Sequence, residues 1–227
     1  MRAVAVVPAR GASKGIRRKN VRLFLGRPLL VWTVEVGLES GIGPVIVSTE
    51  NEEVADVARA AGAEVVERPV ELTGDDVPTG PAVRHAVQGL DADFVLVLEP
   101  TAPARQVFHV REALDLLVSS GADSVAGVSE VPYHHTAEKQ LRLGAEGLLA
   151  ALDGRAVADM THRRQDVAPT YAFNGVVWGC RAGVLQADTL WGDRVVGYLV
   201  DPRYAIDLDR PEDWEPAEAR MKELLDA

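Results

Sequence analysis

The 227-residue sequence lacks several features that define whole classes of protein. Its single cysteine, Cys180, cannot form a disulfide within the chain, which fits a reducing compartment. No apolar run approaches the roughly 20 residues of a membrane-spanning helix, and the N-terminus leads directly into a strand-like run, so we expect a cytoplasmic protein with no membrane partner. No repeat, low-complexity segment or convincing linker divides the sequence, so we expect a single domain over residues 1–227.

Basic residues are also in the minority. The chain has 24 Lys and Arg against 34 Asp and Glu, which gives a formal net charge of −10. Such a surface disfavours a general nucleic-acid binder, because the phosphate backbone requires a broad basic face. A small anionic ligand remains compatible with this charge if the basic residues are gathered in one place.

Short apolar runs alternate with helical patterns along the chain. Strands are predicted at 3–7, 44–48, 64–66, 93–98, 124–128, 173–179 and 194–200, and helices at 29–40, 50–62, 78–89, 107–120 and 211–226. This alternation predicts an α/β fold with a doubly wound, mostly parallel, Rossmann-like sheet, in which the most apolar strand, 93–98, is central. Residues 131–170 break the rhythm and predict an excursion from the sheet, either a lid or a dimerisation arm.

The segment after the first strand concentrates positive charge. Residues 8–20, PARGASKGIRRKN, include five basic side chains. Ligands of open α/β sheets bind beyond the carboxyl ends of the strands, and Gly11 and Gly15 allow successive backbone N–H groups to point at one anion. The loop matches neither the Walker A pattern nor G-x-G-x-x-G. It therefore predicts a polyphosphate site of another kind, with a solvated basic turn as the alternative.

This loop resembles the signature P-A-R-x-x-S-K-G-x-x-x-K-N of the acylneuraminate cytidylyltransferase family, the CMP-sialic acid synthetases and their relatives. Further matching pieces follow in the family's order, among them LEPTAP at 98–103, NG at 174–175 and IDLD at 206–209. The resemblance implies a nucleotide-diphospho-sugar transferase fold and transfer of CMP from CTP to the hydroxyl of a 2-keto sugar acid, with release of pyrophosphate and help from Mg²⁺. It also implies a homodimer.

The resemblance assigns roles to particular residues. The candidate catalytic residues are Arg10, Lys19 and Asp209, and the candidate nucleotide-binding residues are Ala9, Arg10, Gly11, Ala12, Ser13, Lys14, Lys19 and Asn174. Asp207 and Asp209 are the expected Mg²⁺ ligands. Their i, i+2 spacing places both on one face of an extended segment, and Mg²⁺ prefers oxygen ligands. The alternative for Asp209 is a cap at the start of the last helix.

The acceptor side departs from the family. Its candidate residues are Glu99, Arg105 and Arg164. The family usually has glutamine at the position of Glu99, and an ionised carboxylate cannot donate a hydrogen bond. Arg163 adjoins Arg164, so the register is open by one residue, and a solvated arginine pair is the alternative. A phosphonate acceptor, or a nucleotide-binding module without catalysis, is therefore the alternative to a sugar-acid enzyme.

Overall fold

The structure is a computed structural model that describes residues 1–12, 15–160 and 163–226. Seven strands form the main sheet: β1 (Ala3–Pro8), β4 (Val45–Thr49), β5 (Glu64–Glu67), β6 (Phe94–Val97), β7 (Ser124–Glu130), β10 (Tyr171–Arg181) and β11 (Val195–Leu199). The helices are α1 (Leu29–Ser40), α2 (Glu52–Ala60), α3 (Thr79–Ala86), α4 (Val107–Ser120) and α5 (Trp214–Leu225). Two small hairpins add β2 (Leu23–Phe24) with β3 (Arg27–Pro28), and β8 (Leu141–Leu143) with β9 (Leu149–Ala151).

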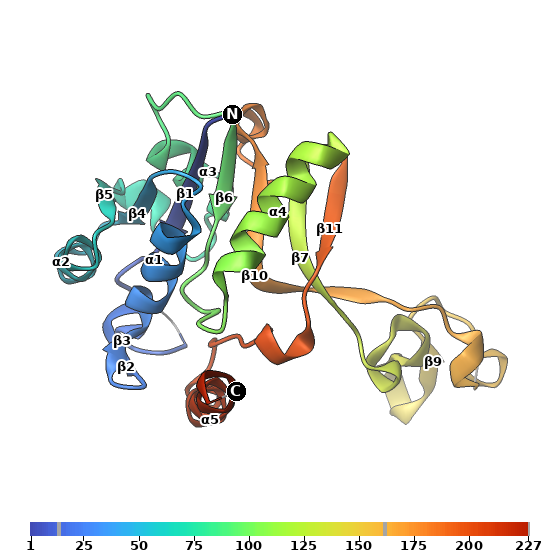
Figure 1. Cartoon of the computed structure of the whole chain (residues 1–227). Coiled ribbons are helices and arrows are strands. Elements are labelled where there is room, and N and C mark those ends of the chain that lie inside the picture. Colours follow the sequence, from blue (N-terminus) through green and yellow to red (C-terminus); the bar gives the residue numbers. More distant parts are fainter. Residues whose placement is uncertain (13–14, 161–162, 227) are drawn as a thin grey trace.

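The sheet has the strand order β11-β7-β10-β6-β1-β4-β5. Every neighbouring pair is parallel except the two pairs that β10 makes with β6 and β7. The predicted mostly parallel α/β sheet is thus confirmed, and the run predicted to be central is β6, in the middle of the order. Because β1, β4 and β6 run in the same direction, their carboxyl ends meet at one edge of the sheet (Figure 1).

Side chains of the strands alternate between two apolar layers. Ala5 and Val7 of β1 pack with α1, α2 and α4 on one face, whereas Val4 and Val6 pack with α3 and the segment 182–191 on the other. This period of two is the reason that a strand buried on both faces reads as a continuous apolar run.

A third apolar cluster fixes the end of the chain beneath the sheet edge. Phe24, Trp214 and Leu208 belong to it, and the Phe24 and Trp214 rings meet edge to face at 5.7 Å. Leu208 is completely buried, and its backbone N–H donates to the Thr101 carbonyl at 3.1 Å. The IDLD segment is therefore held in place by the buried residues between its aspartates.

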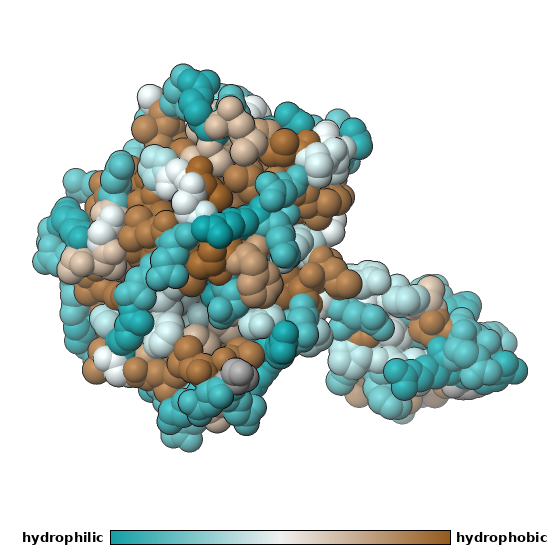
Figure 2. All heavy atoms as spheres, viewed as in Figure 1, coloured by the Kyte–Doolittle hydropathy of each residue, from teal (hydrophilic) through white to brown (hydrophobic). Residues whose placement is uncertain are grey.

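The predicted excursion at 131–170 is an arm that projects from the body (Figure 1). At its base β7 and β10 still pair, with Tyr171 opposite Glu130. Beyond this point the described part of the arm holds the β8–β9 hairpin and short 3-10 turns. Figure 2 shows the arm as a separate lobe joined to the body by a narrow neck. Leu143 and Leu148 in this lobe are 73% and 71% exposed.

Membrane insertion finds no support in the helices: none within the described ranges combines the length and the apolar character needed to cross a bilayer.

Candidate functional site

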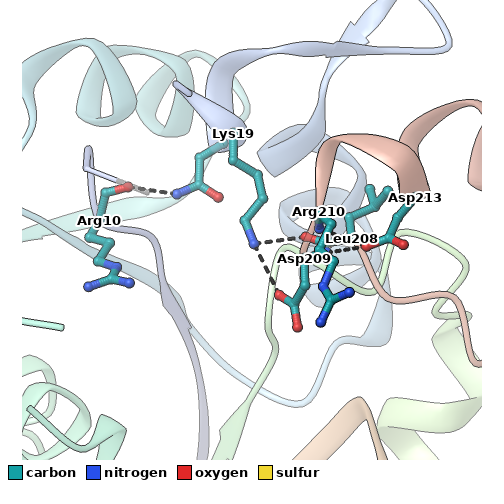
Figure 3. Close-up of polar contacts among 7 residues, drawn as sticks. Arg10, Lys19, Leu208, Asp209, Arg210 and Asp213 are labelled. Atoms are coloured by element: carbon teal, nitrogen blue, oxygen red, sulfur yellow. Dashed lines mark hydrogen bonds and ion pairs between the residues drawn. The ribbon is translucent and has the colours of Figure 1, made fainter. Parts of the chain in front are cut away.

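The basic loop leaves β1 at the edge where the carboxyl ends of the parallel strands meet. Ala9 is buried, and its N–H donates to the Ser48 carbonyl at 3.0 Å, which continues the pairing of β1 with β4. The side-chain amide of Asn20 donates to the Arg10 carbonyl at 2.8 Å and so ties the two ends of the loop together (Figure 3). Ser13 and Lys14 lie outside the described residues.

Acidic groups partner the cations of this loop. The Arg10 guanidinium forms an ion pair with Asp75 at 2.6 Å, and the Gly11 N–H donates to Glu50 Oε1 at 2.7 Å. The Arg10 side chain is one-third exposed, so its charge lies at the surface of the site. The carboxylates of Glu50 and Asp75 therefore hold the loop at the sheet edge.

Lys19 joins this loop to the other end of the chain. Its ammonium donates to the Leu208 carbonyl at 2.8 Å and lies 3.4 Å from Asp209 Oδ1 (Figure 3). Gly15 lies against the same segment, because a Cβ there would be 2.0 Å from the Asp209 carbonyl oxygen. The structure thus brings two of the three predicted catalytic residues, Lys19 and Asp209, into direct contact.

Asp207 and Asp209 are close enough to interact. Partial burial raises the pKa of Asp207, and the charge of Asp209 raises it further, while a hydrogen bond with Thr101 opposes the shift. Asp209 does not cap the last helix: Asp213 occupies the N-cap position of α5, and its Oδ2 accepts from the preceding N–H groups of Asp209 and Arg210 at 3.1 and 2.7 Å (Figure 3). The carboxylate of Asp209 is 70% exposed and faces Lys19.

This pair of carboxylates fits Mg²⁺. The ion usually takes one or two carboxylates and completes its shell with phosphate oxygens and water. Mutual repulsion of the kind that raises the pKa of Asp207 is relieved when a cation lies between two carboxylates. Within residues 1–12, 15–160 and 163–226 no set of three or more His, Cys, Asp or Glu side chains forms a metal site on its own, so the remaining ligands would come from a bound molecule.

Glu99 lies beneath the site, two residues after the end of β6. Burial raises the pKa of its carboxyl to about 7, and the charge of Asp207 adds to the shift, whereas Arg105 and Lys19 oppose it. The Glu99 Oε2 lies close to Gly175, whose φ of 68° belongs to the bulge of β10. Near neutral pH this glutamate is therefore divided between a charged form and a neutral form that can donate a hydrogen bond.

The Arg105 side chain is buried and does not reach the surface of the site, where an acceptor substrate would bind. Its residue is 1% exposed, and its guanidinium donates to the Glu99 carbonyl at 2.7 Å, to Thr33 Oγ1 at 3.0 Å and to the Val176 carbonyl. Burial lowers the pKa of Arg105 to about 9. The arginine expected to bind the acceptor directly instead supports the floor of the site from below, because its donors are used by backbone carbonyls.

Asn174 has its polar atoms engaged within the β10 bulge. Its Nδ2 donates to Ser129 Oγ at 3.0 Å, and its Oδ1 accepts from the Val176 N–H at 3.1 Å. Arg164 lies on the exposed arm, away from the sheet edge, and the neighbouring Arg163 pairs with Asp166 at 3.0 Å. Within one chain the structure therefore does not bring Arg164 to the other predicted site residues.

A pocket of about 280 Å³ extends the site between β1, α3 and the loop 72–79. Arg10, Arg68 and Glu99 line it together with Thr79 and Ala82 at the start of α3. Arg68 is buried, and it donates to the Ser48 carbonyl at 2.8 Å and to Ser48 Oγ at 3.1 Å. Sequence reasoning assigned no role to Arg68. Its position directly after β5, at the same sheet edge, is the signal that could have found it.

Comparison with known proteins identifies the family. The family model described as "Cytidylyltransferase" matches residues 4–148. The chain belongs to the cytidylyltransferase family. N-acylneuraminate cytidylyltransferase A of Danio rerio is 31% identical over 219 residues, covering 96% of this chain and 50% of the relative. The N-acylneuraminate cytidylyltransferase of Escherichia coli O18:K1:H7 (strain RS218 / NMEC) is 28% identical over 218 residues, covering 94% and 51%.

Solved structures agree with this cytidylyltransferase fold. The structure titled as CMP:2-keto-3-deoxy-manno-octonic acid synthetase complexed with CTP has a TM-score of 0.74 at 17% identity and covers 99% of this chain and 100% of that one. A nucleotidyl transferase from Methanothermobacter thermautotroptrophicus has a TM-score of 0.61 at 18% identity, covering 98% and 99%. This chain spans about half the length of the curated relatives that it matches.

The contact between Gly15 and the Asp209 backbone yields a first prediction. In the Gly15→Ala variant the new Cβ would meet the Asp209 carbonyl at 2.0 Å, so the basic loop must move away from the IDLD segment. We expect the affinity for CTP, measured by calorimetry, to fall about tenfold or more, a loss of about 1.4 kcal/mol. Gly183→Ala is the control, because a Cβ there meets open space. Equal affinities of the two variants would contradict the prediction.

Glu99 yields a prediction about stability. Because its folded-state pKa is raised to about 7, the folded chain binds more protons than the unfolded chain between about pH 4.5 and 7. The free energy of unfolding should therefore fall as pH rises through this window, by roughly 2 to 3 kcal/mol from this group, and level off above it. For Glu99→Gln, the free energy of unfolding measured by urea denaturation should depend less on pH over the same window. An equal pH dependence of the unfolding free energy in the variant and the original chain would refute the assignment of this effect to Glu99.

Proposed function

We propose that this chain transfers CMP from CTP to a hydroxyl group of a sialic-acid-like 2-keto sugar acid and releases pyrophosphate. The observation that carries the proposal is the contact of Lys19 with Leu208 and Asp209, which closes the basic loop onto the pair of carboxylates. Cation donors for phosphates and carboxylates for a metal thereby meet at one sheet edge. The similarity to N-acylneuraminate cytidylyltransferases along 94–96% of the chain supports the same reaction class.

The nucleotide would lie between the basic loop and the 280 Å³ pocket. A cytosine base presents two hydrogen-bond acceptors, O2 and N3, on one edge, which suits a buried guanidinium such as that of Arg68. Arg10 lines the same pocket from the loop side and would approach the phosphates. The base and the triphosphate would thus be held by different walls of one continuous site.

In the proposed reaction the acceptor hydroxyl releases its proton to water, and its oxygen forms a bond to the α-phosphorus of CTP. The bond from this phosphorus to the bridging oxygen breaks, and pyrophosphate leaves with the electron pair. Arg10 and Lys19 would neutralise charge on the phosphates as it shifts to the leaving group, which is the main contribution a protein makes to such a transfer. Mg²⁺, when bound by Asp207 and Asp209, would supply further positive charge to the same phosphates.

The acceptor would approach from the side of Glu99 and the β10 bulge. An ionised Glu99 repels an anionic group, whereas its protonated form can donate a hydrogen bond as a glutamine does. Because Glu99 stands where the family usually has glutamine, a phosphonate acceptor is the second candidate. Arg164 could reach an acceptor only in an assembly, because it lies on the arm of its own chain. A cytoplasmic setting is part of this proposal, because Cys180, the single cysteine, is free and buried.

Pyrophosphate release tests the proposed activity. The chain is incubated with Mg²⁺, each of four nucleoside triphosphates, and a panel of nonulosonic acids and phosphonates. We expect release only with CTP plus an acceptor, and a fall in kcat of at least about 100-fold in Asp209→Ala. Glu212→Ala is the control, since this exposed acid lies three residues away and outside the pair. No pyrophosphate release with any combination would refute the proposed enzymatic activity. CTP binding without turnover would support the non-catalytic alternative.

We also propose that the arm mediates a homodimer. Leu143 and Leu148 are more than 70% exposed on a projecting lobe, an arrangement that favours burial against a second copy. Light scattering should therefore give twice the chain mass of 24.4 kDa. The double variant Leu143→Asp/Leu148→Asp should have the single-chain mass. Leu90→Asp, which changes an exposed leucine of the body, should remain dimeric. A single-chain mass for the unaltered protein would contradict the proposal.

A further inference from the structure

Glu50 is a carboxylate that lies against the basic loop, where the triphosphate is proposed to bind. It follows β4 directly, at the sheet edge where the basic loop leaves β1. Its Oε1 accepts the Gly11 N–H at 2.7 Å. Its Oε2 is buried and has no hydrogen-bond partner among the described residues. One oxygen thus occupies an N–H group of the loop, while the other lacks a donor, which is an unfavourable state for a buried carboxylate.

The contact between Gly11 and Glu50 is enforced by packing. A Cβ on Gly11 would lie 2.5 Å from Asn51 Cβ, so the loop backbone is pressed against the start of α2. Asn51 itself is held as the cap of this helix, because its Oδ1 accepts the Val54 N–H at 3.1 Å. The Gly11 amide consequently has little freedom to turn away from Glu50.

The electrostatic surroundings of Glu50 are cationic. Burial is the main cause of the lowered pKa of Arg68, and among charged neighbours Glu50 opposes this shift while Arg10 adds to it. Glu50 is thus a carboxylate that acts on Arg68, and Arg10, which lines the pocket with Arg68, acts on the same guanidinium. A carboxylate that accepts a backbone N–H beside a buried guanidinium has the hydrogen-bonding and charge properties of a bound phosphate oxygen.

We propose that Glu50 stands in for a phosphate oxygen in the nucleotide-free site: it holds the basic loop through Gly11 and sets the affinity for triphosphate. This inference rests on the proposed function, in which a triphosphate binds at the loop. When a triphosphate arrives, it competes with Glu50 for the Gly11 N–H or is repelled by its charge. Glu50 is accordingly a positioning residue that limits how tightly the substrate binds.

Replacing the charge while keeping the acceptor separates the two effects of Glu50. In Glu50→Gln an amide oxygen can still accept the Gly11 N–H, while the negative charge next to Arg68 is removed. We expect this variant to bind both inorganic tripolyphosphate and CTP about tenfold more tightly in calorimetry. Glu50→Ala loses the anchor as well, so its affinities should be about tenfold weaker than those of Glu50→Gln.

Glu52→Gln is the matched control. It removes the same charge from the same turn, but Glu52 is exposed and pairs with Arg59, so its affinities should stay within about twofold of the original. The inference is overturned if Glu50→Gln binds tripolyphosphate no more tightly than Glu52→Gln while its thermal unfolding is unchanged. It is equally overturned if the original chain binds no tripolyphosphate.

Tripolyphosphate distinguishes this inference from the proposed function, because it carries no base. Tighter tripolyphosphate binding in Glu50→Gln, together with equal affinity for all four nucleoside triphosphates, would support the role of Glu50 and count against CTP as the substrate. CTP-dependent pyrophosphate release with a KM for CTP unaffected by Glu50→Gln would uphold the enzyme and overturn the role of Glu50. A lower KM at similar kcat supports both.

Discussion

The site depends on one contact between segments at opposite ends of the chain. Lys19 donates to the Leu208 carbonyl at 2.8 Å, and its ammonium lies 3.4 Å from Asp209. Ordering two segments 190 residues apart costs conformational entropy, which an exposed ion pair alone cannot offset. The buried Leu208 and the Trp214 cluster provide the apolar burial that holds the C-terminal segment in place. The polar contact then selects the position of Lys19 on a surface that is already built.

The buried guanidinium of Arg105 supports the opposite wall. The Arg105 guanidinium joins the turn after β6 to the β10 bulge through the carbonyls of Glu99 and Val176. Because these acceptors are carbonyls rather than a carboxylate, the positive charge of Arg105 is not cancelled by a direct ion pair. It acts on the Glu99 carboxyl against the larger effect of burial. The same arginine thus fixes the backbone below the site and partly offsets the rise that burial causes in the pKa of Glu99.

The sequence predicted those features whose cause is local. Apolar runs and helical patterns located the strands and helices, and the position of the basic loop after β1 followed from the chain order. The directions of side chains were harder, because they depend on partners far along the chain. Arg105 was predicted to bind the acceptor, but it is buried and donates to the Val176 carbonyl of β10. The pocket beside Arg68 escaped prediction because the loop 72–79 has no periodicity that reveals what it packs against.

The positive charge of the basic loop has a different meaning in the fold from that in the sequence. Five basic residues in thirteen positions suggested an island of uncompensated charge in an acidic chain. In the structure Arg10 pairs with Asp75, Arg18 with Glu53 and Lys19 with Asp209, while Glu50 accepts a backbone N–H of the same loop. Some of the acidic residues that make the chain negative therefore pair with the basic residues of the site. A ligand gains affinity there only to the extent that it replaces these carboxylates, so a compact polyphosphate with its own metal ion is favoured over a single weak anion.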